Sequence, residues 1–339
     1  MDNAGRARIM APFFLGLLLC FSAPAAAQVD FTGVWNGNTN AEDGPERAQG
    51  PSLVEFVGLP ITDHARQWGL AYRPGRLSLP EHQCQVHVVH YIHRGPFGTR
   101  IWEERDPVTH QLIAIHQAIN TYEQKRTIWM DGRPHPSPNA AHTWMGFSTG
   151  VWEGNMLTVT TTHIKQGWHR RENLPSSDEA TSIEHWVRNG ALWTHISVTE
   201  DPIFLSEPLI KSEDFTLNPS PNFNPFWPCE YIEEGERARG EVPHYLPGEN
   251  PWMAEYAATH RLPQEATLGG AEQMYPEYRA RLKTLPVAVF TSPDDPPAPP
   301  PAAPPGRRGA SPPAAPAGGG RGGAGAAGRG GAAPAGRGQ

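Results

Sequence analysis

The chain has 339 residues and a formal net charge of −7 at pH 7. Its two ends are positively charged, and the core of about 265 residues between them carries −11, which argues against nucleic acid as a partner. A core of that length is enough for one large domain or two small ones.

Residues 1–27 have the pattern of an export signal. Two arginines precede an apolar run from Ile9 to Phe21, and a small-residue cleavage site ends at Ala27. A lipoprotein would be cleaved before Cys20 and carry its lipid there, but such a site needs a small residue before the cysteine, and Leu19 is not small. The apolar run is too short to span a bilayer, and no later stretch approaches ~20 apolar residues. We therefore predict a periplasmic or secreted protein without a transmembrane segment.

Export would leave two cysteines in the mature chain, Cys84 and Cys229. In an oxidising compartment an even pair of cysteines predicts a disulfide bond, and two unpaired buried thiols are the alternative. The bond would tie a proline-rich arm, which ends at Cys229, across the early strands.

Strand patterns follow one another through most of the core without long helices between them. Asp-Gly, Gly-Asn and Asn-Gly pairs mark the turns, because these residues reach positive φ at low cost. Strands at this spacing predict a mainly β protein, an antiparallel barrel or sandwich. The predicted strands cover 30–35, 81–93, 99–104, 111–119, 125–130, a pair that turns at 153–155, and the hairpin strands 182–188 and 191–200.

Short helices are predicted where a proline follows or precedes a capping residue. Thr62 caps the first helix, which runs through Trp68, and Asn250 caps the second. These helices begin after Pro60, at Pro251 and at Pro276. Residues 165–180 and the segment between Pro202 and Cys229 are predicted to be connections.

The chain therefore divides into four predicted parts. The signal at 1–27 is followed by a β-rich, barrel-like domain at 28–230 and by an arm at 231–291, whose short helices pack on the barrel. Residues 292–339 consist of Pro, Ala, Gly and Arg and are predicted to be disordered, because such a segment buries no apolar surface. The tail's arginines would allow contact with anionic envelope surfaces, and a plain spacer is the alternative.

The turn at Asn189-Gly190 predicts which side chains of its hairpin share a face. The more apolar face is predicted to point inward and consists of Ile183, His185, Val187, Leu192, Thr194, Ile196 and Val198. The other face is predicted to point outward, with Glu184 and His195 as an exposed charge pair beside Trp186, Arg188 and Trp193. By the same alternation Leu157, Val159, Thr161 and His163 point inward.

Two inward histidines, His163 and His185, are the candidate catalytic residues, with His142 as a third. We expect the side chains of His163 and His185 to approach within about 10 Å, with Thr161 and Thr194 near them, because their strands are close in sequence. Histidine suits acid–base work near neutral pH. The alternative is that each is an interior histidine hydrogen-bonded to a threonine.

Two other motifs are not assigned a chemical role. His87 and His93 share a face of the predicted strand 81–93, but they lie ~20 Å apart, too far to bind one ion, so no metal ligand is predicted there. Residues 146–150 match Gly-x-Ser-x-Gly, but a nucleophilic serine needs a helix directly after it, and Ser148 is followed by a tryptophan-rich hairpin.

Five segments resemble a family of exported bacterial proteins that has no established activity. The resemblance covers residues 30–230 and is carried by DFTGVW, TIWMDGRPHP, GFSTGVWEGNMLTVTTTHIK, RRENLPSSDEATSIEHW and EDPIFLSEPLI. It implies export and a β-rich fold, and it assigns no catalytic residues. The chain departs from the usual pattern at VHVVHYIH and at residues 171–173. The Gly-x-Trp of the first strand also resembles the start of lipocalin-like (calycin) barrels.

The leading hypothesis is an exported β-barrel protein that binds a small, partly apolar ligand in its interior. Arg170 could hold an anionic group of such a ligand, and the pocket wall is predicted to consist of Trp129, Trp144, Trp152, Thr161 and Thr194. The first alternative is an enzyme that uses the three candidate histidines as acid–base groups or as ligands of a zinc- or copper-type ion. The second is an envelope structural protein anchored by its tail. The sequence names no cofactor.

Overall fold

The computed structural model describes residues 29–38, 56–71, 86–93, 98–119, 124–170, 174–220, 222–223 and 244–293. The chain divides into two compact units, residues 1–295 and 296–339, and every described residue belongs to the first. The predicted signal, Cys84, Cys229 and nearly all of the predicted tail lie outside the described residues. No helix in the described part is both long and apolar enough to cross a membrane.

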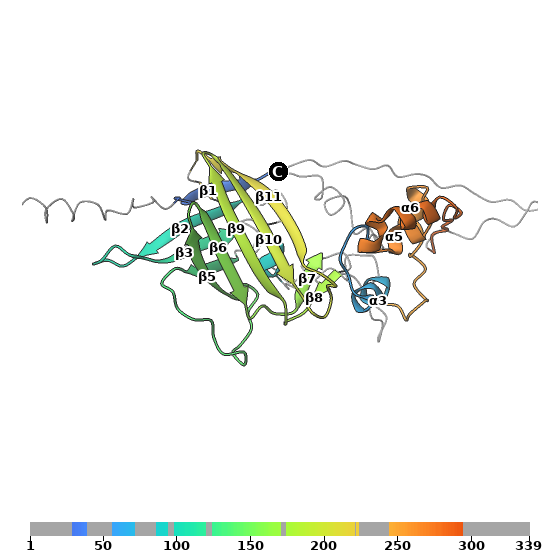
Figure 1. Cartoon of the computed structure of the whole chain (residues 1–339), viewed down its shortest axis with the longest axis horizontal. Helices are drawn as coiled ribbons and strands as arrows, with labels where there is room; N and C mark the ends of the chain where they lie inside the picture. Colours follow the sequence, from blue (N-terminus) through green and yellow to red (C-terminus); the bar gives the residue numbers. More distant parts are fainter. Residues whose placement is uncertain are drawn as a thin grey trace, which may run out of the picture. The chain divides into compact units, whose positions relative to one another are not determined.

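The described strands form a closed barrel of nine strands, which confirms the predicted β-barrel (Figure 1). Around the barrel the strand order is β1-β11-β10-β9-β6-β5-β4-β3-β2, and all neighbours are antiparallel except β4 and β5. The strands are β1 (Gly33–Gly37), β2 (Thr99–Arg105), β3 (Leu112–Ile119), β4 (Lys125–Trp129), β5 (Phe147–Glu153), β6 (Met156–Thr162), β9 (Thr181–Asn189), β10 (Leu192–Glu200) and β11 (Leu209–Asn218).

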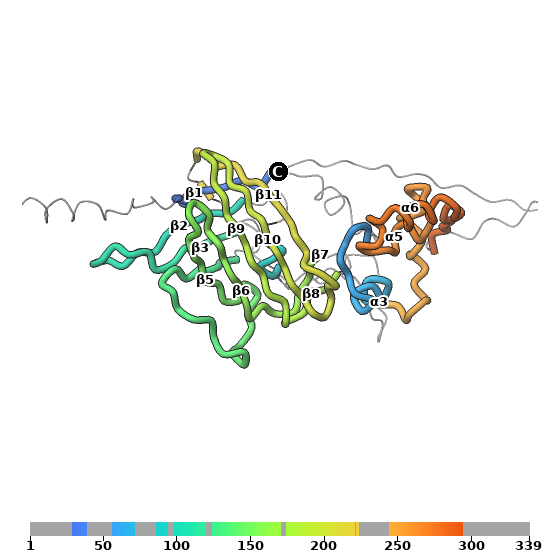
Figure 2. Tube along the Cα trace, viewed as in Figure 1, coloured from blue at the N-terminus to red at the C-terminus, as the bar shows by residue number. Residues whose placement is uncertain are grey.

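The parallel pair follows from the length of the connection between β4 and β5. Parallel neighbours need a crossover, because a short turn reverses the chain. Residues 130–146 provide this crossover, which the tube in Figure 2 traces outside the barrel wall between the two strands. Its start is held by Arg133, which pairs with Asp131 at 2.5 Å and lies over the ring of Trp129.

The hairpin of β9 and β10 forms, but its turn is one residue later than predicted. Asn189 pairs with Leu192, so the loop consists of Gly190 and Ala191, and Gly190 adopts the positive φ of 62°. Val187 therefore lies opposite Thr194 instead of Leu192. The two sets of residues that share a face are unchanged, because partner positions shift by two and side chains alternate with period two.

The predicted orientation of that hairpin is wrong. Trp186 and Trp193 have no exposed surface, and Glu184 and His195 are each 1 % exposed, so their face points into the barrel. Ile183, Val187 and Leu192 are exposed on the outside. The two tryptophans have far more apolar surface to bury than β-branched residues, and the two charged groups find buried partners that the hairpin alone does not contain.

An aromatic cluster fills part of the barrel interior. Trp193 stacks on Phe215 with ring centroids 4.4 Å apart and packs against Trp186 at 4.7 Å and Trp35 at 5.8 Å. Phe31 packs edge-on against Trp186 at 5.5 Å. Aliphatic residues of β2, β3, β4 and β6 complete this core, namely Ile101, Ile115, Ile128, Leu157 and Val159.

The segment predicted as the strand 81–93 is not a strand where it is described. It forms the 3-10 helix η3 (Val89–Tyr91), and Val88, Val89, Tyr91 and Ile92 are all buried. A strand would have alternated buried and exposed side chains. In this segment consecutive side chains are buried, and they form one cluster with Ile119 and Ile164. The helix places His90 and His93 in the interior.

Two segments predicted as connections contain strands. Residues 165–180 hold a two-stranded sheet of β7 (Gly167–Arg170) and β8 (Leu174–Ser176), and the proline-rich stretch after Pro202 contains β11, which closes the barrel against β1. The pairing of β7 with β8 is irregular and short, and prolines flank β11. Both features hide strands from a periodicity search.

The helices confirm two of the three predicted starts. Thr62 caps α3 (Asp63–Ala71) by accepting a hydrogen bond from the Ala65 N–H, and Pro276 begins α6 (Pro276–Leu282). The helix expected at Pro251 begins later, as α4 (Glu255–Thr259). The remaining short helices are α5 (Glu265–Leu268) and η4 (Ala271–Met274). An apolar cluster around Phe56, Ile61 and Phe204 joins α3 to Trp252 and Leu268.

Candidate functional site

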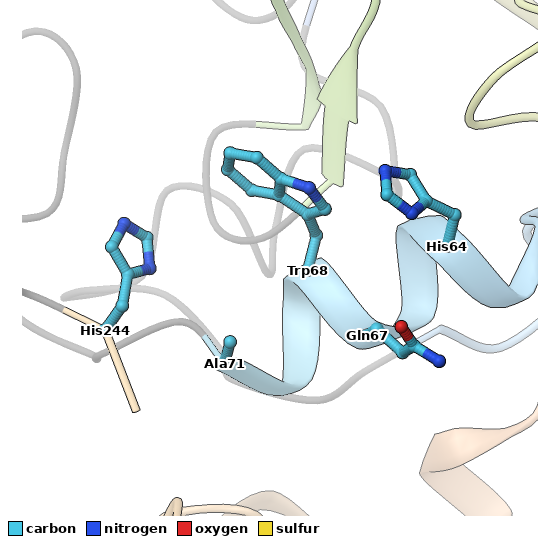
Figure 3. Close-up of a pocket in the computed structure, with 5 residues that line it drawn as sticks. All are labelled: His64, Gln67, Trp68, Ala71 and His244. Atoms are coloured by element: carbon cyan, nitrogen blue, oxygen red, sulfur yellow. The ribbon is translucent and has the colours of Figure 1, made fainter. Parts of the chain in front are cut away.

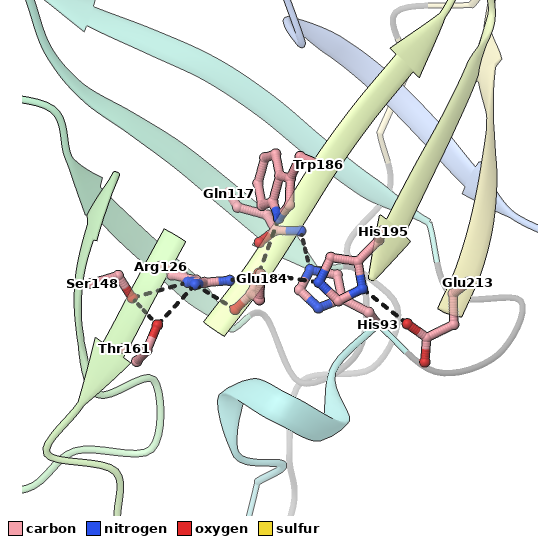
Figure 4. Close-up of polar contacts among 9 residues, drawn as sticks. All are labelled: His93, Gln117, Arg126, Ser148, Thr161, Glu184, Trp186, His195 and Glu213. Atoms are coloured by element: carbon pink, nitrogen blue, oxygen red, sulfur yellow. Dashed lines mark hydrogen bonds and ion pairs between the residues drawn. The ribbon is translucent and has the colours of Figure 1, made fainter. Parts of the chain in front are cut away.

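A buried ion pair crosses the barrel interior from β4 to β9 (Figure 4). Arg126 donates to both carboxylate oxygens of Glu184, over 2.7 and 3.0 Å, and both side chains are 1 % exposed. Arg126 also donates to Ser148 at 3.2 Å and to Thr161 at 3.1 Å. Ser148 therefore helps to hold the Arg126 side chain. No helix directly follows Ser148 in β5, so it lacks the setting that a nucleophilic serine needs.

His195 continues this chain of charges toward β11. Its Nε2 lies 3.1 Å from Glu184 Oε2, and its Nδ1 lies 2.9 Å from Glu213 Oε2. Burial acts to lower the pKa of His195, but hydrogen bonds from its ring to the two carboxylates, and their charges, raise the pKa to about 9. The charges therefore alternate in sign along the series Arg126, Glu184, His195 and Glu213.

The same chain lowers the pKa of Glu184. Burial acts to raise the pKa of this carboxyl, but the charge of Arg126 and the hydrogen bond from His195 outweigh burial and hold it well below its ordinary value. The indole N–H of Trp186 donates a further hydrogen bond to Glu184 at 3.0 Å. Glu184 is therefore an ionised carboxylate inside the barrel.

His93 adds an uncharged imidazole to this cluster. Its ring lies against the His195 ring, with centroids 3.9 Å apart, and its Nε2 lies 2.8 Å from Gln117 Nε2. Burial lowers the pKa of His93 well below its ordinary value, and the charge of His195 lowers it further. Its Nδ1 is buried and has no hydrogen-bond partner among the described residues.

One nitrogen each of His93 and His195 and one oxygen of Glu184 lie within 4.8 Å of one another. Ligands bound to one ion at about 2.0–2.1 Å are separated by roughly 2.9–3.4 Å, and the 3.1 Å between His195 Nε2 and Glu184 Oε2 falls in that range. Glu213 accepts a hydrogen bond from the other ring nitrogen of His195, as the outer partner of a metal-bound histidine does. The donor set therefore fits a divalent transition-metal ion.

A second buried histidine cluster lies at β7. His169 Nε2 is 2.9 Å from Asp201 Oδ2, and the hydroxyl of Ser177 donates to Asp201 Oδ1 at 2.7 Å. The His90 ring lies 4.8 Å from the His169 ring, and burial lowers the pKa of both histidines. Asp201 also accepts from the backbone N–H of Phe204, so this cluster fixes the turn after β10.

A pocket of about 370 Å³ lies beside α3, away from the barrel interior (Figure 3). Its lining consists of His64, Gln67, Trp68, Ala71 and His244. The Trp68 ring lies edge-on to His244 at 6.1 Å, and His64 stacks on Phe204 at 5.2 Å. None of the residues predicted to bind a ligand lines this pocket.

The predicted shared site of His163 and His185 does not form. His185 is on the outer face of β9, where its Nδ1 lies 3.2 Å from Thr158 Oγ1. His163 follows β6 with a positive φ of 56°, five residues beyond Thr158, which corresponds to ~16 Å along a strand. The fold instead brings His163 to His142, with ring centroids 5.3 Å apart.

The residues predicted to bind a ligand separate into inner and outer positions. Thr161 points inward and contacts Arg126, and Trp152 packs on Phe31 at the aromatic cluster. Thr194 is on the outer face and donates to Asp214 at 2.7 Å, so its predicted inward orientation is wrong. The others lie away from the inner cluster: Trp129 under Arg133, Trp144 under Lys165, and Arg170 on β7.

Sequence reasoning missed Arg126, Gln117 and Glu213. Arg126 alternates with Ile128 on β4 and Gln117 with Ile115 on β3, so each shares a face with buried isoleucines. That alternation was a signal that polar groups enter the interior. Comparison of the chain with protein-family models, curated proteins and solved structures finds no match in any of the three.

Proposed function

We propose that this protein is a metal-binding β-barrel protein in which His93, Glu184 and His195 hold one divalent transition-metal ion. The observation that carries the proposal is the convergence of these three buried donors within 4.8 Å. Two imidazoles and one carboxylate form a donor set that zinc and ferrous iron use in proteins.

The ion would take the place of a proton. In the structure His195 Nε2 and Glu184 Oε2 are joined by a hydrogen bond, and an ion bound to both atoms would lie between them. Metal binding to a protonated imidazole releases that proton. Arg126 keeps its 2.7 Å hydrogen bond to Glu184 Oε1, and the ion would bind Oε2, which also accepts hydrogen bonds from Arg126 and from Trp186 at 3.0 Å.

Such an ion would add a link between the η3 segment and the barrel wall, beside the hydrogen bond between His93 and Gln117. Glu184 and His195 belong to neighbouring barrel strands, whereas His93 follows η3. All three side chains are buried, so we assign the ion a structural role, in which it ties the η3 segment to the barrel wall. The proposal shares a metal ion with the first alternative hypothesis from the sequence, but it assigns the ion to residues other than His142, His163 and His185 and gives it no enzymatic role.

We expect zinc to bind at one ion per chain and to raise the melting temperature. Binding at 100 times the dissociation constant adds about 2.7 kcal/mol to the free energy of unfolding, which corresponds to roughly 5–10 °C for a domain of this size. His93→Gln should abolish both effects, because it removes a ligand that is neutral and so leaves no buried charge unpaired. Isothermal titration calorimetry and a thermal melt measure the two quantities.

The control for that experiment is His116→Gln, on the outer face of β3. His116 contacts Thr127 and Glu104 at the surface, and its replacement should leave zinc uptake unchanged. Unchanged zinc affinity in the His93→Gln protein, or no zinc uptake by the unmodified chain, would show that these residues do not hold the ion.

Binding of a small, partly apolar ligand is a second candidate function, favoured by a different observation. The indole N–H groups of Trp152 and Trp193 are buried in the aromatic cluster, and no described residue accepts a hydrogen bond from either. Buried donors are rarely left without a partner. Trp152 is only partly buried, so a ligand with an acceptor atom could reach it beside Phe31.

A ligand at this position should be carried through purification and detected by native mass spectrometry. Trp152→Phe keeps an aromatic ring but removes the N–H, so we expect ligand occupancy to fall at least tenfold, in line with one hydrogen bond to a buried donor. Trp129→Phe, on the outer face of β4, is the matched control. Equal occupancy in the two variants would contradict a role for Trp152.

Export to the periplasm or the medium is part of the same proposal. Its support is the signal pattern of residues 1–27 and the resemblance to exported bacterial proteins. Cleavage after Ala27 would leave Cys84 and Cys229 as a pair, and the proposed disulfide between them belongs to this proposal as well.

A further inference from the structure

Two neighbouring rows on the outer surface of five adjacent strands consist of uncharged residues and one histidine. Two rows of cross-strand partners run over β5, β6, β9, β10 and β11, and we name them the outer sheet face (Figure 1). The first row is Thr149, Thr160, Ile183, Val198 and Ile210, and the second is Val151, Thr158, His185, Ile196 and Ser212.

The apolar members of the outer sheet face are exposed. Ile210 is 64 % exposed, Val151 is 63 % and Ile183 is 37 %. The ten residues of the face include no Asp, Glu, Lys or Arg, and His185 is the one ionisable residue among them. At the edge of the face the carboxylate of Glu153 accepts a hydrogen bond from Thr158, and the His135 ring contacts Thr149. Single exposed apolar residues are ordinary on a protein surface, whereas a contiguous patch rimmed by polar residues marks an interaction surface.

The central strands are apolar on both sides, which separates this face from an ordinary barrel exterior. Trp186 and Leu157 fill the interior from β9 and β6, while Ile183 and Ile196 lie outside on β9 and β10. An antiparallel sheet with one face in water alternates apolar and polar residues, and one with apolar residues on both faces is usually covered on both. This two-sided pattern is why the apolar face of the hairpin was predicted to point inward.

We propose that a second copy of this chain covers the outer sheet face and that the protein is a two-fold symmetric dimer. A partner that recognises charge gains nothing from a neutral face, whereas a second copy presents the same β-branched surface. Two such sheets pack face to face at about 10 Å. A two-fold axis through the face makes the contact self-complementary.

The size of the face is adequate for this contact. Five strands at about 4.8 Å spacing and about seven residues along each strand, a length that takes in the rows on either side, cover roughly 600 Å² in projection. Interdigitated side chains bury more than the projected area, and stable interfaces bury about 800 Å² on each partner. The neighbouring row adds Met156, Val187 and Thr194 to the same surface and ends at Glu153 and Asp214, which belong to the polar rim of the contact.

Sedimentation velocity of the full chain tests the proposal. We expect twice the chain mass at micromolar concentration. Ile183→Lys combined with Ile210→Lys should give the single-chain mass at the same concentration, because each copy would bury two unpaired ammonium groups. Ile210→Lys alone, at a residue already 64 % exposed, should weaken the dimer at least tenfold without disturbing the barrel.

The control is Val108→Lys, which changes an apolar residue that is 83 % exposed in the turn between β2 and β3 and should leave the dimer intact. A single-chain mass for the unmodified protein at about 100 μM would overturn the proposal, since standard-size interfaces hold at that concentration. So would a dimer that persists in the double variant with unchanged affinity.

Discussion

Arg126→Met should lower the free energy of unfolding by about 3–5 kcal/mol, the cost of leaving a buried charge without its partner. The arginine is the sole cation that contacts both oxygens of Glu184 among the described residues, and both side chains are 1 % exposed. Methionine fills similar volume, so the loss comes from the buried carboxylate, which in the described part of the chain keeps only the His195 ring and the Trp186 N–H as partners. Urea unfolding, followed by tryptophan fluorescence, measures the change.

A double variant separates the charge from the packing. Arg126→Met combined with Glu184→Leu removes both charges, and buried pairs replaced in this way often lose little stability. We expect the double variant to be more stable than Arg126→Met alone, with some cost because Trp186 and His195 each lose a hydrogen-bond partner. Additive losses from the two single changes would contradict a direct coupling between the residues.

The surface pair of Arg133 and Asp131 is the matched control. It has the same chemistry and a 2.5 Å contact, but both side chains are more than one third exposed. Arg133→Met should therefore change the stability far less than Arg126→Met.

Trp193→Ala should also destabilise the barrel by about 3–5 kcal/mol, because it leaves a cavity in the aromatic cluster. Trp193 has no exposed surface and contacts Phe215, Trp186, Trp35 and Phe31. For a domain of this size the loss corresponds to a fall in melting temperature of roughly 6–20 °C. A thermal melt followed by circular dichroism measures it.

The control is Trp102→Ala, on the outer face of β2. Trp102 stacks on His116 and is only partly buried, so its loss removes less packed surface. Equal effects for the two tryptophans would mean that the hairpin of β9 and β10 does not point Trp193 inward.

The sequence was sufficient for the strands that alternate and end at recognisable turns. The hairpins β5–β6 and β9–β10 were predicted because Gly154 and Gly190 adopt positive φ at their turns. It was not sufficient for η3, whose side chains are buried on all sides, nor for β11, whose surroundings are rich in proline. These elements form because of tertiary contacts that no local pattern contains.

The site was missed because alternation reveals which residues share a face, and not which face is buried. Counting apolar residues favoured the face of Ile183 and Val187, whereas the barrel buries Trp186 with Glu184 and His195. On that second face Glu184 pairs with Arg126 on β4, 58 residues away in sequence, and His195 pairs with Glu213 on β11. A long-range partner of this kind cannot be read from the hairpin alone.

The metal proposal can be tested most directly by anomalous diffraction at the zinc absorption edge from crystals of the zinc-loaded full chain. We predict one strong peak inside the barrel, at about 2.0–2.2 Å from one nitrogen each of His93 and His195 and from one carboxylate oxygen of Glu184. Peaks confined to surface histidines, with none between these three side chains, would contradict the proposed metal centre.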